Sequence, residues 1–391
     1  MITKDKKHQK HANLTKPNYG FFGRNEWAII GTPCGKIQQL AYALTEQLND
    51  DYKVAYVDAD HKSADDEKAK GRAGNTAMAH GAHLEYTDKI TFNRFDTEAR
   101  LDTYQYRQWF NEQDLVLVNG NHFKAKKQIV VIDPKKEESL SRKLDRLTDV
   151  DLVLVTKGSQ ELYPFLKDHL ENWQDIPVLG IDEVDKIASF LRESVKEALP
   201  PLFGLVLAGG KSQRMGEDKG LINYHGKSQR EHMADLLRDI CDQTFISCRP
   251  DQVDEIERYS TLPDTVAGLG PFGAILSAFR AYPNHAWLVV ACDLPLLDKK
   301  ILTQLRSSRN PSKIATAFNS PVTEFPEPLI CVWEPKAYPV LLQFLAQGYS
   351  CPRKVLINSD VELLDAANPK ALSNVNKPEE RAEIVRILNN E

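Results

Sequence analysis

Short apolar runs rich in Val and Ile alternate with helical patterns along the first half of this chain. The runs are WAIIGT (27–32), KVAYVDAD (53–60), DLVLVNGN (114–121), QIVVID (128–133), DLVLVTKG (151–158) and PVLGID (177–182). Such runs are typical of strands buried on both faces of a sheet. Between the first two runs, the apolar residues of 36–48 recur at helical spacing. This order predicts an α/β fold with a mostly parallel sheet.

Two adjacent prolines interrupt the pattern near the middle of the chain. A helical pattern ends at Pro200-Pro201, because proline lacks the N–H group that a helix needs. A second alternation of strand and helix patterns starts directly afterwards. Since 391 residues are too many for one ordinary core, we predict a loose tail over residues 1–24 and two doubly wound domains, over residues 25–199 and 200–391.

Composition disfavours several classes of partner. The formal net charge is −5, which argues against nucleic acid as a bulk partner. No apolar run approaches membrane-spanning length, and residues 1–20 lack the apolar core of a secretion signal. The six cysteines are scattered without a CxxC pair, which argues against a structural zinc site or a disulfide framework. We therefore expect a cytoplasmic protein that binds neither nucleic acid nor membrane.

The stretch LAGGKSQRMGEDKG, residues 207–220, follows the first strand pattern of the second domain. In a doubly wound sheet, ligands bind beyond the carboxyl ends of the strands. Gly209 and Gly210 can turn the backbone sharply and expose N–H groups to an anion, and Arg214 and Lys219 add positive charge. Two glycines alone would favour a simple tight turn with solvated basic residues. The complete string favours a cradle for a triphosphate.

This stretch resembles the glycine-rich loop of the molybdenum cofactor guanylyltransferase family. Three further segments resemble motifs of that family, in the same order along the chain: LPDTVAGLGPFGAILSA (262–278), VVACDLPLL (289–297) and SNVNKPEER (373–381). Together the four motifs cover essentially all of residues 202–391. The resemblance implies that the second domain is a Rossmann-like nucleotidyltransferase.

The resemblance also implies a role for each matching residue. The nucleotide contacts would be Leu207, Ala208, Gly209, Gly210, Lys219, Asp264 and Asp293. The catalytic residues would be Lys219, Arg214 and Asp293. Asp293 would in addition hold Mg²⁺, a hard ion that prefers oxygen ligands. The alternative for Asp293 is an N-cap of the segment that follows it.

Three residues are predicted near the second substrate: Asn374, Asn376 and Arg353. For Arg353, a place on a solvated face is an equal alternative. The chain departs from the family at Ser247, where an asparagine is common, and this departure puts that nucleotide contact in doubt.

The implied reaction is transfer of GMP from GTP to the terminal phosphate of molybdenum-molybdopterin, with release of pyrophosphate. The LAGG string and the Gly270-Pro271 turn favour GTP over CTP by family analogy. Cytidylyl transfer, or transfer to another phosphorylated acceptor, is one alternative, and a non-catalytic carrier of the cofactor is another. A molybdoenzyme apoprotein or a cofactor-insertion protein is a possible partner.

The first domain carries a degenerate P-loop in IIGTPCGKIQQL (29–40). Relative to the G-x-x-x-x-G-K-[ST] pattern, Ile30 replaces the first glycine and Ile37 replaces the hydroxyl residue that would bind Mg²⁺. Pro33 removes one backbone N–H group from the cradle. Residues 25–198 resemble, in order and spacing, the GTP-binding accessory protein of molybdenum cofactor guanylation, with Asn119 where that protein has an acid. The resemblance implies a P-loop-like domain without appreciable NTP hydrolysis.

Overall fold

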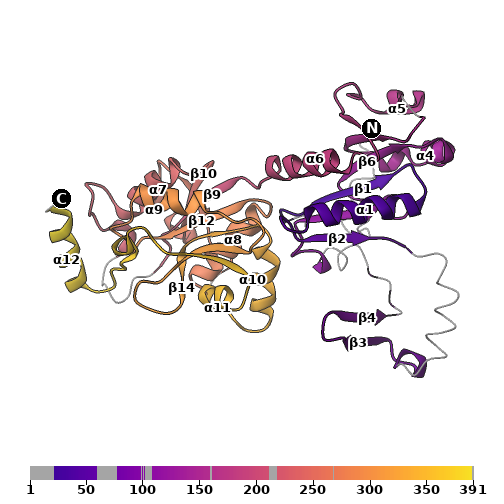
Figure 1. Ribbon diagram of the computed structural model, residues 1–391. Coiled ribbons are helices and arrows are strands. Elements are labelled where there is room, and N and C mark those ends of the chain that lie inside the picture. The colour runs from indigo at the N-terminus through magenta and orange to yellow at the C-terminus, as the bar shows by residue number, and fades with distance from the viewer. Residues whose placement is uncertain are drawn as a thin grey trace, which may run out of the picture. The chain divides into compact units, whose positions relative to one another are not determined.

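The computed structural model describes residues 22–59, 77–97, 99, 101, 108–158, 161–210, 218–266 and 268–389. Arg214, a predicted catalytic residue, lies outside these ranges. The described chain forms two compact units. Of the described residues, the first unit comprises those within 25–194, and the second comprises those within 195–389 together with residues 22–24. Each unit is described by itself below (Figure 1).

The first unit is built on a six-stranded sheet in the order β2-β5-β1-β6-β7-β8. Its strands are β1 (Asn25–Ile30), β2 (Val54–Val57), β5 (Leu115–Asn119), β6 (Lys127–Ile132), β7 (Val150–Val155) and β8 (Val178–Gly180). Every neighbouring pair in this sheet is parallel. Each of the six apolar runs overlaps one of these strands, so the predicted parallel α/β architecture is confirmed.

The first helix of this unit, α1 (Cys34–Leu48), buries the apolar face that the spacing predicts: Ile37, Leu40, Ala41, Leu44 and Leu48. Truncating one such buried leucine to alanine typically costs ~2–5 kcal/mol of stability. The described residues of this unit also form α4 (Glu137–Ser141), α5 (Pro164–His169) and α6 (Val184–Glu197), with short 3₁₀ turns at Met78–His80, Pro134–Lys136 and Leu144–Arg146. An antiparallel pair, β3 (Leu84–Asp88) and β4 (Asn93–Thr97), was not among the predicted elements.

The second unit contains a seven-stranded sheet in the order β11-β10-β9-β12-β14-β13-β15. Its strands are β9 (Leu202–Leu207), β10 (Gln243–Cys248), β11 (Ser260–Pro263), β12 (Ala286–Ala291), β13 (Ala315–Asn319), β14 (Pro326–Trp333) and β15 (Val361–Leu364). β14 runs antiparallel to both of its neighbours, and the other pairs are parallel. The chain passes from β9 to β10 and β11 on one side and returns to β12 on the other. The carboxyl ends of β9, β10 and β12 therefore meet at a switch point, where open α/β sheets bind ligands.

Helices cover both faces of this second sheet (Figure 1). They are α7 (Gln229–Arg238), α8 (Pro271–Ala281), α9 (Lys299–Ser307), α10 (Ala337–Ala346), α11 (Pro352–Ile357) and α12 (Pro378–Asn389), with 3₁₀ turns at Lys219–Leu221, Pro250–Glu255 and Pro369–Leu372. Leu202 and Val206 of β9 pack in a core with α7 and α9, whereas the alternate residues Phe203 and Leu205 pack with α8 and α10. This alternation explains why β9 is apolar along its whole length.

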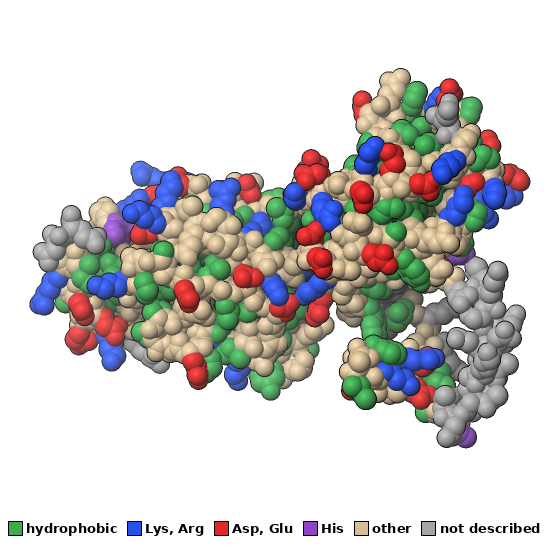
Figure 2. Space-filling view, in the orientation of Figure 1, with side chains coloured by type: hydrophobic (Ala, Val, Ile, Leu, Met, Phe, Trp, Pro, Cys, Tyr) green, Lys and Arg blue, Asp and Glu red, His purple; other side chains and the backbone are tan. Residues whose placement is uncertain are grey.

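The described surface carries charges of both signs. Lys and Arg side chains are interspersed with Asp and Glu side chains on the face drawn in Figure 2. Within the described ranges, no helix combines the length and the apolar character that crossing a membrane requires.

Candidate active site

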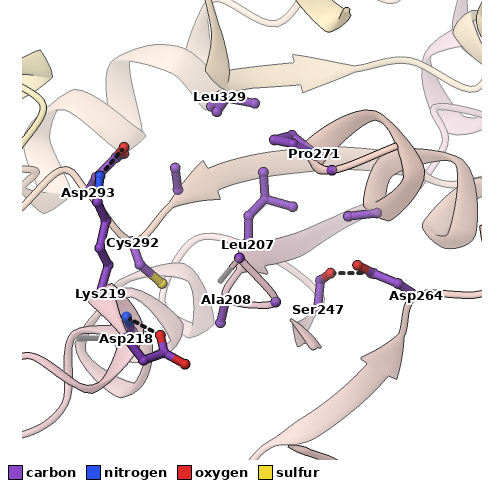
Figure 3. A pocket seen from close by; sticks show the side chains of 16 residues that line it. Leu207, Ala208, Asp218, Lys219, Ser247, Asp264, Pro271, Cys292, Asp293 and Leu329 are labelled. Atoms are coloured by element: carbon purple, nitrogen blue, oxygen red, sulfur yellow. Dashed lines mark hydrogen bonds and ion pairs between the residues drawn. The ribbon is translucent and has the colours of Figure 1, made fainter. Parts of the chain in front are cut away.

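A pocket of about 200 Å³ lies at the carboxyl edge of the second sheet (Figure 3). It is lined from the ends of β9, β10 and β12, from the loop after β11 and from the start of α8. The pocket brings together all seven predicted nucleotide contacts: Leu207, Ala208, Gly209, Gly210, Lys219, Asp264 and Asp293. Their roles stay predictions. A shared nucleotide site requires these residues to line one cavity, and they do.

The glycine turn forms one wall of the pocket. A Cβ atom on Gly209 would lie 3.3 Å from Asp264 Oδ2 and 3.4 Å from the Arg249 nitrogen, whereas one on Gly210 would meet nothing within 4 Å. Arg249 Nη1 donates to the Gly209 carbonyl at 3.3 Å. Glycine at 209 therefore permits a close backbone approach, and the arginine holds the turn in place.

Lys219 begins the 3₁₀ turn that follows the loop. Its ammonium lies 2.8 Å from Asn376 Oδ1 and 3.4 Å from Asp293 Oδ2. Asp218, directly before it, accepts from the Gly220 nitrogen at 2.9 Å and from Gln252 Nε2 at 3.1 Å. The turn is thus fixed at both Asp218 oxygens, and the lysine extends toward Asp293 (Figure 3). The Lys219 ammonium is therefore held between the Asp293 carboxylate and the Asn376 amide oxygen, at the side of the pocket.

Asp293 follows β12 after the buried Cys292. The N-cap of α9 is Asp298, whose Oδ1 accepts from the Ile301 nitrogen at 2.9 Å. Asp293 therefore does not have the N-cap role that was its alternative. Its carbonyl accepts from the Val375 nitrogen at 2.8 Å, which ties the C-terminal segment to the end of β12.

The hydrogen bond between Val375 and Asp293 places the neighbouring Asn376 beside Lys219. Val375 and Ile384 are buried in a small apolar cluster with Ile222, and Glu380 Oε2 accepts from the Asn376 nitrogen at 2.6 Å. The backbone hydrogen bond to Asn376 lowers the pKa of Glu380, although burial acts in the opposite direction. The C-terminal segment is consequently part of the site.

On the other side of the pocket, Ser247 Oγ donates to Asp264 Oδ1 at 2.7 Å (Figure 3). Burial raises the pKa of Asp264, and the bond from Ser247 opposes that rise. Ser247 is the position at which the chain departs from its family. Its hydroxyl holds the carboxylate of Asp264.

The start of α8 completes the cradle. A Cβ atom on Gly273 would lie 2.3 Å from the Val266 carbonyl oxygen, so only glycine permits the loop after β11 to pack there. Ser277 Oγ accepts from the Thr265 nitrogen at 2.9 Å. No acidic residue occupies the first turn of α8. The positive end of the helix dipole at Pro271 therefore faces the pocket, and no carboxylate of the helix's own first turn opposes it.

The donors present fit a divalent cation that is shared with substrate. Among the described residues, no group of three or more His, Cys, Asp or Glu side chains is arranged to hold a metal ion by itself. Mg²⁺ commonly takes one or two carboxylates and completes its shell with water and phosphate oxygens. Three carboxylates line the pocket. Asp218 accepts from Gly220 and Gln252, and Asp264 accepts from Ser247, so Asp293 is the carboxylate predicted to serve in this way.

The other predicted residues lie at different places. Asn374 is exposed. Arg353 donates from Nε to the Pro326 carbonyl at 3.2 Å and pairs with Glu327 at 3.5 Å. Its guanidinium is therefore engaged by β14. The substrate roles of Asn374 and Arg353 stay predictions.

The sequence did not predict two contacts of the site: the hydrogen bond from Ser247 to Asp264 and the one from Lys219 to Asn376. It indicated these four residues one by one, but not their pairing. The signal for the first was a polar residue at the end of each of two neighbouring strands, β10 and β11.

The pocket lies at a switch point of the sheet and combines a glycine turn, a lysine and a strand-end carboxylate. These features are typical of a nucleotide-binding enzyme, and comparison with known families agrees. Residues 204–362 match the MobA-like NTP transferase domain. The chain is therefore a nucleotidyltransferase.

The particular family follows from its relatives. A molybdenum cofactor guanylyltransferase of Pseudomonas putida is 34% identical over 196 residues, which cover 47% of this chain and 97% of that protein. A molybdenum cofactor biosynthesis bifunctional protein of Synechocystis is 37% identical over 186 residues. That match covers 47% of this chain and about half, 54%, of the bifunctional protein. The chain belongs to the molybdenum cofactor guanylyltransferase family, as its motifs predicted.

The first unit has a weaker counterpart. A solved structure of molybdopterin-guanine biosynthesis protein B is 16% identical, covers 44% of this chain and 99% of its own, and has a TM-score of 0.31. Because this TM-score is below 0.5, the fold of the first unit is assigned from its sheet order.

Proposed function

We propose that this protein joins the GMP unit of GTP to the terminal phosphate of molybdenum-bearing molybdopterin and releases pyrophosphate. The observation that carries the proposal is the placement of the Lys219 ammonium between Asp293 and Asn376 at the glycine-walled pocket. The names of the relatives, guanylyltransferases of the molybdenum cofactor, support the choice of both substrates.

In this reaction the substrate supplies the nucleophile. A phosphate oxygen of the acceptor attacks the α-phosphorus of GTP, and the bond from that phosphorus to the β-phosphate oxygen breaks. Cys292 lies in the pocket wall, but burial raises the pKa of its thiol far above the ordinary value. A neutral buried thiol is a poor nucleophile. Catalysis then rests on positioning and on stabilising charge.

The residues of the pocket divide this work. The backbone at Gly209 and Gly210 and the start of α8 would receive phosphate oxygens. Lys219 would balance the negative charge that develops on the leaving pyrophosphate. Asp293 would hold Mg²⁺, which when bound supplies further positive charge at the phosphates. Arg214 belongs to the same predicted set through its motif.

The nucleotide base is assigned to the opposite wall. Ser247 orients the carboxylate of Asp264, which lies against Gly209. We assign the nucleoside to Asp264 and the phosphates to the stretch from Gly209 toward Lys219. Cytidylyl transfer is the competing reaction. A purely non-catalytic cofactor carrier would not require a cation, a strand-end carboxylate and an oriented second carboxylate around one cavity.

The first unit is proposed to act as a docking or cofactor-handling module, and the boundary near residues 194–200 is proposed to separate it from the transferase. Delivery to a molybdoenzyme apoprotein or insertion protein, and a cytoplasmic location, are further proposals from the sequence.

The test is to incubate the full-length protein with Mg²⁺, molybdenum-loaded molybdopterin and each of the four NTPs in turn, and to identify products by mass. We expect the guanine dinucleotide from GTP, and no product after chelation of the metal. A cytosine dinucleotide formed equally fast from CTP would replace the guanylyl assignment. Absence of product with every NTP, in a protein that binds the cofactor, would favour the carrier.

A further inference from the structure

The carboxyl edge of the first sheet carries a cysteine and a histidine in contact. Cys34 is the first residue of α1 and His122 follows β5; Cys34 Sγ lies 3.3 Å from His122 Nε2. Asn121 Nδ2 lies 3.5 Å from the same sulfur and donates to the Thr32 carbonyl at 2.9 Å. These residues occupy the edge at which an α/β sheet presents its ligand sites.

Positive charge lies near the sulfur. α1 has fifteen residues, its N-cap Pro33 makes no side-chain cap bond, and its first turn has no acidic residue. The positive end of the helix therefore acts on Cys34 directly. The ammonium of Lys143 interacts with the sulfur and donates to the Asn121 carbonyl at 3.3 Å. Burial and neighbouring cations lower the pKa of Lys143.

An opposing charge lies on the neighbouring strand. Tyr56 is close enough to Cys34 to interact with it electrostatically, and burial together with Asp58 raises the pKa of the tyrosine far above its ordinary value. Asp58 accepts from the Tyr56 hydroxyl at 2.6 Å and from Asn119 Nδ2 at 2.7 Å. The carboxylate of Asp58 is thus engaged by two donors.

The other five cysteines differ from Cys34. Burial raises the pKa of Cys248 to about 11 and that of Cys241 to about 12. Cys292 and Cys331 are buried as well. Cys351 is exposed at the start of the short helix α11, and no described hydrogen bond joins its sulfur to a histidine. It is therefore an internal reference for an accessible thiol without a base.

We propose that Cys34 and His122 form a nucleophile–base pair, and that Cys34 is a site of oxidation by hydrogen peroxide. The thiol proton passes to His122 Nε2, the sulfur attacks one peroxide oxygen, and an S–O bond forms while the O–O bond breaks. The leaving hydroxide takes the proton from His122 and becomes water. The sulfur loses two electrons and becomes a sulfenic acid, which thiols can reduce.

The test treats the full-length protein with hydrogen peroxide and dimedone, which traps sulfenic acids, and measures the adduct at each cysteine by peptide mass spectrometry. In the unmodified sequence we expect Cys34 to be labelled at least about tenfold faster than Cys351. Equal rates would overturn the proposal, and this comparison depends on no variant.

A matched variant tests the base. His122→Gln should lower the rate at Cys34 by roughly 10- to 100-fold and leave the rate at Cys351 unchanged. An unchanged rate at Cys34 would overturn the pairing with His122. Equal circular dichroism spectra of the two proteins would show that the variant has kept its fold. The nucleotidyl transfer of the second unit is a separate assay, so its failure would not bear on this result.

Discussion

Each unit of this molecule places a lysine after a glycine-bearing loop at the carboxyl end of its first strand, but the two lysines have different partners. Lys36 Nζ lies 3.0 Å from Asp133 Oδ2. The same oxygen accepts from Thr32 Oγ1 at 2.7 Å, and the Asp133 side chain is only 3% exposed. Lys219 instead bonds to an amide oxygen at 2.8 Å and lies 3.4 Å from a carboxylate that is 22% exposed.

We expect this difference to separate a structural lysine from a lysine that receives substrate. Burial acts to raise the pKa of Asp133, but hydrogen bonds from Thr32 and Lys36 outweigh it and hold that pKa below its ordinary value. Asp133 is thus a stabilised anion that retains Lys36. Asp293 and Asn376 form a less enclosed pair of acceptors, from which an incoming phosphate can draw Lys219. The function of a lysine after a glycine loop can therefore be inferred only when the acceptor that it faces is known.

The largest effect is expected at Lys219. Replacing Lys219 with Ala removes the charge that would balance the pyrophosphate, so transfer should fall by at least about 10³-fold. Pyrophosphate release by the full-length protein is the measurement. Lys219→Arg serves as the control, because it keeps the charge and should retain part of the activity. A Lys219→Ala protein with half of the original rate would remove the distinction between the two lysines.

Asp293→Asn should have the next largest effect. The amide is similar in size but lacks the charge that would hold Mg²⁺, so the rate should fall by ~10²–10³-fold and the Mg²⁺ concentration at half-maximal rate should rise. Asp298→Asn is the matched control, since Asp298 caps α9 and lies outside the pocket lining. Normal turnover with a normal Mg²⁺ dependence would exclude a metal role for Asp293.

A smaller effect is expected from Asn376→Ala, which removes the closest partner of Lys219. The lysine should lose orientation but keep its charge, so we expect about a tenfold loss, mainly in kcat. Asn374→Ala is the control, since Asn374 lies two residues away and is exposed. If Asn374→Ala were the more damaging change, the second substrate would contact Asn374, and the contact between Asn376 and Lys219 would be of minor importance.

The sequence predicted the parts of this comparison that depend on local pattern. The spacing of apolar residues predicted the strands of the first sheet and the buried face of α1. The order of the four motifs predicted which residues line the pocket of the second unit. The partners of the polar side chains were not predictable in this way. Lys219 and Asn376 are 157 residues apart, and their contact depends on how α12 packs on the loop at Ile222. Lys36 and Asp133, 97 residues apart, meet because β6 lies beside β1.

The smallest effect on transfer is expected at Lys36. This variant tests whether the lysine of the first unit has only a structural role. Lys36→Ala should leave nucleotidyl transfer within about twofold of the original rate, because this ammonium is bonded to Asp133. It should instead affect stability. The buried Asp133 would lose one of its donors while keeping Thr32 and the Lys135 nitrogen, which should cost about 1–2 kcal/mol in the free energy of unfolding. Lys135→Ala is the matched control, since it removes a nearby side chain but keeps that backbone donor. Urea unfolding and GTP hydrolysis without acceptor would be measured on all three proteins. GTP hydrolysis that disappears with Lys36→Ala, at unchanged stability, would show that the first unit retains a working phosphate site, and that both lysines are substrate lysines.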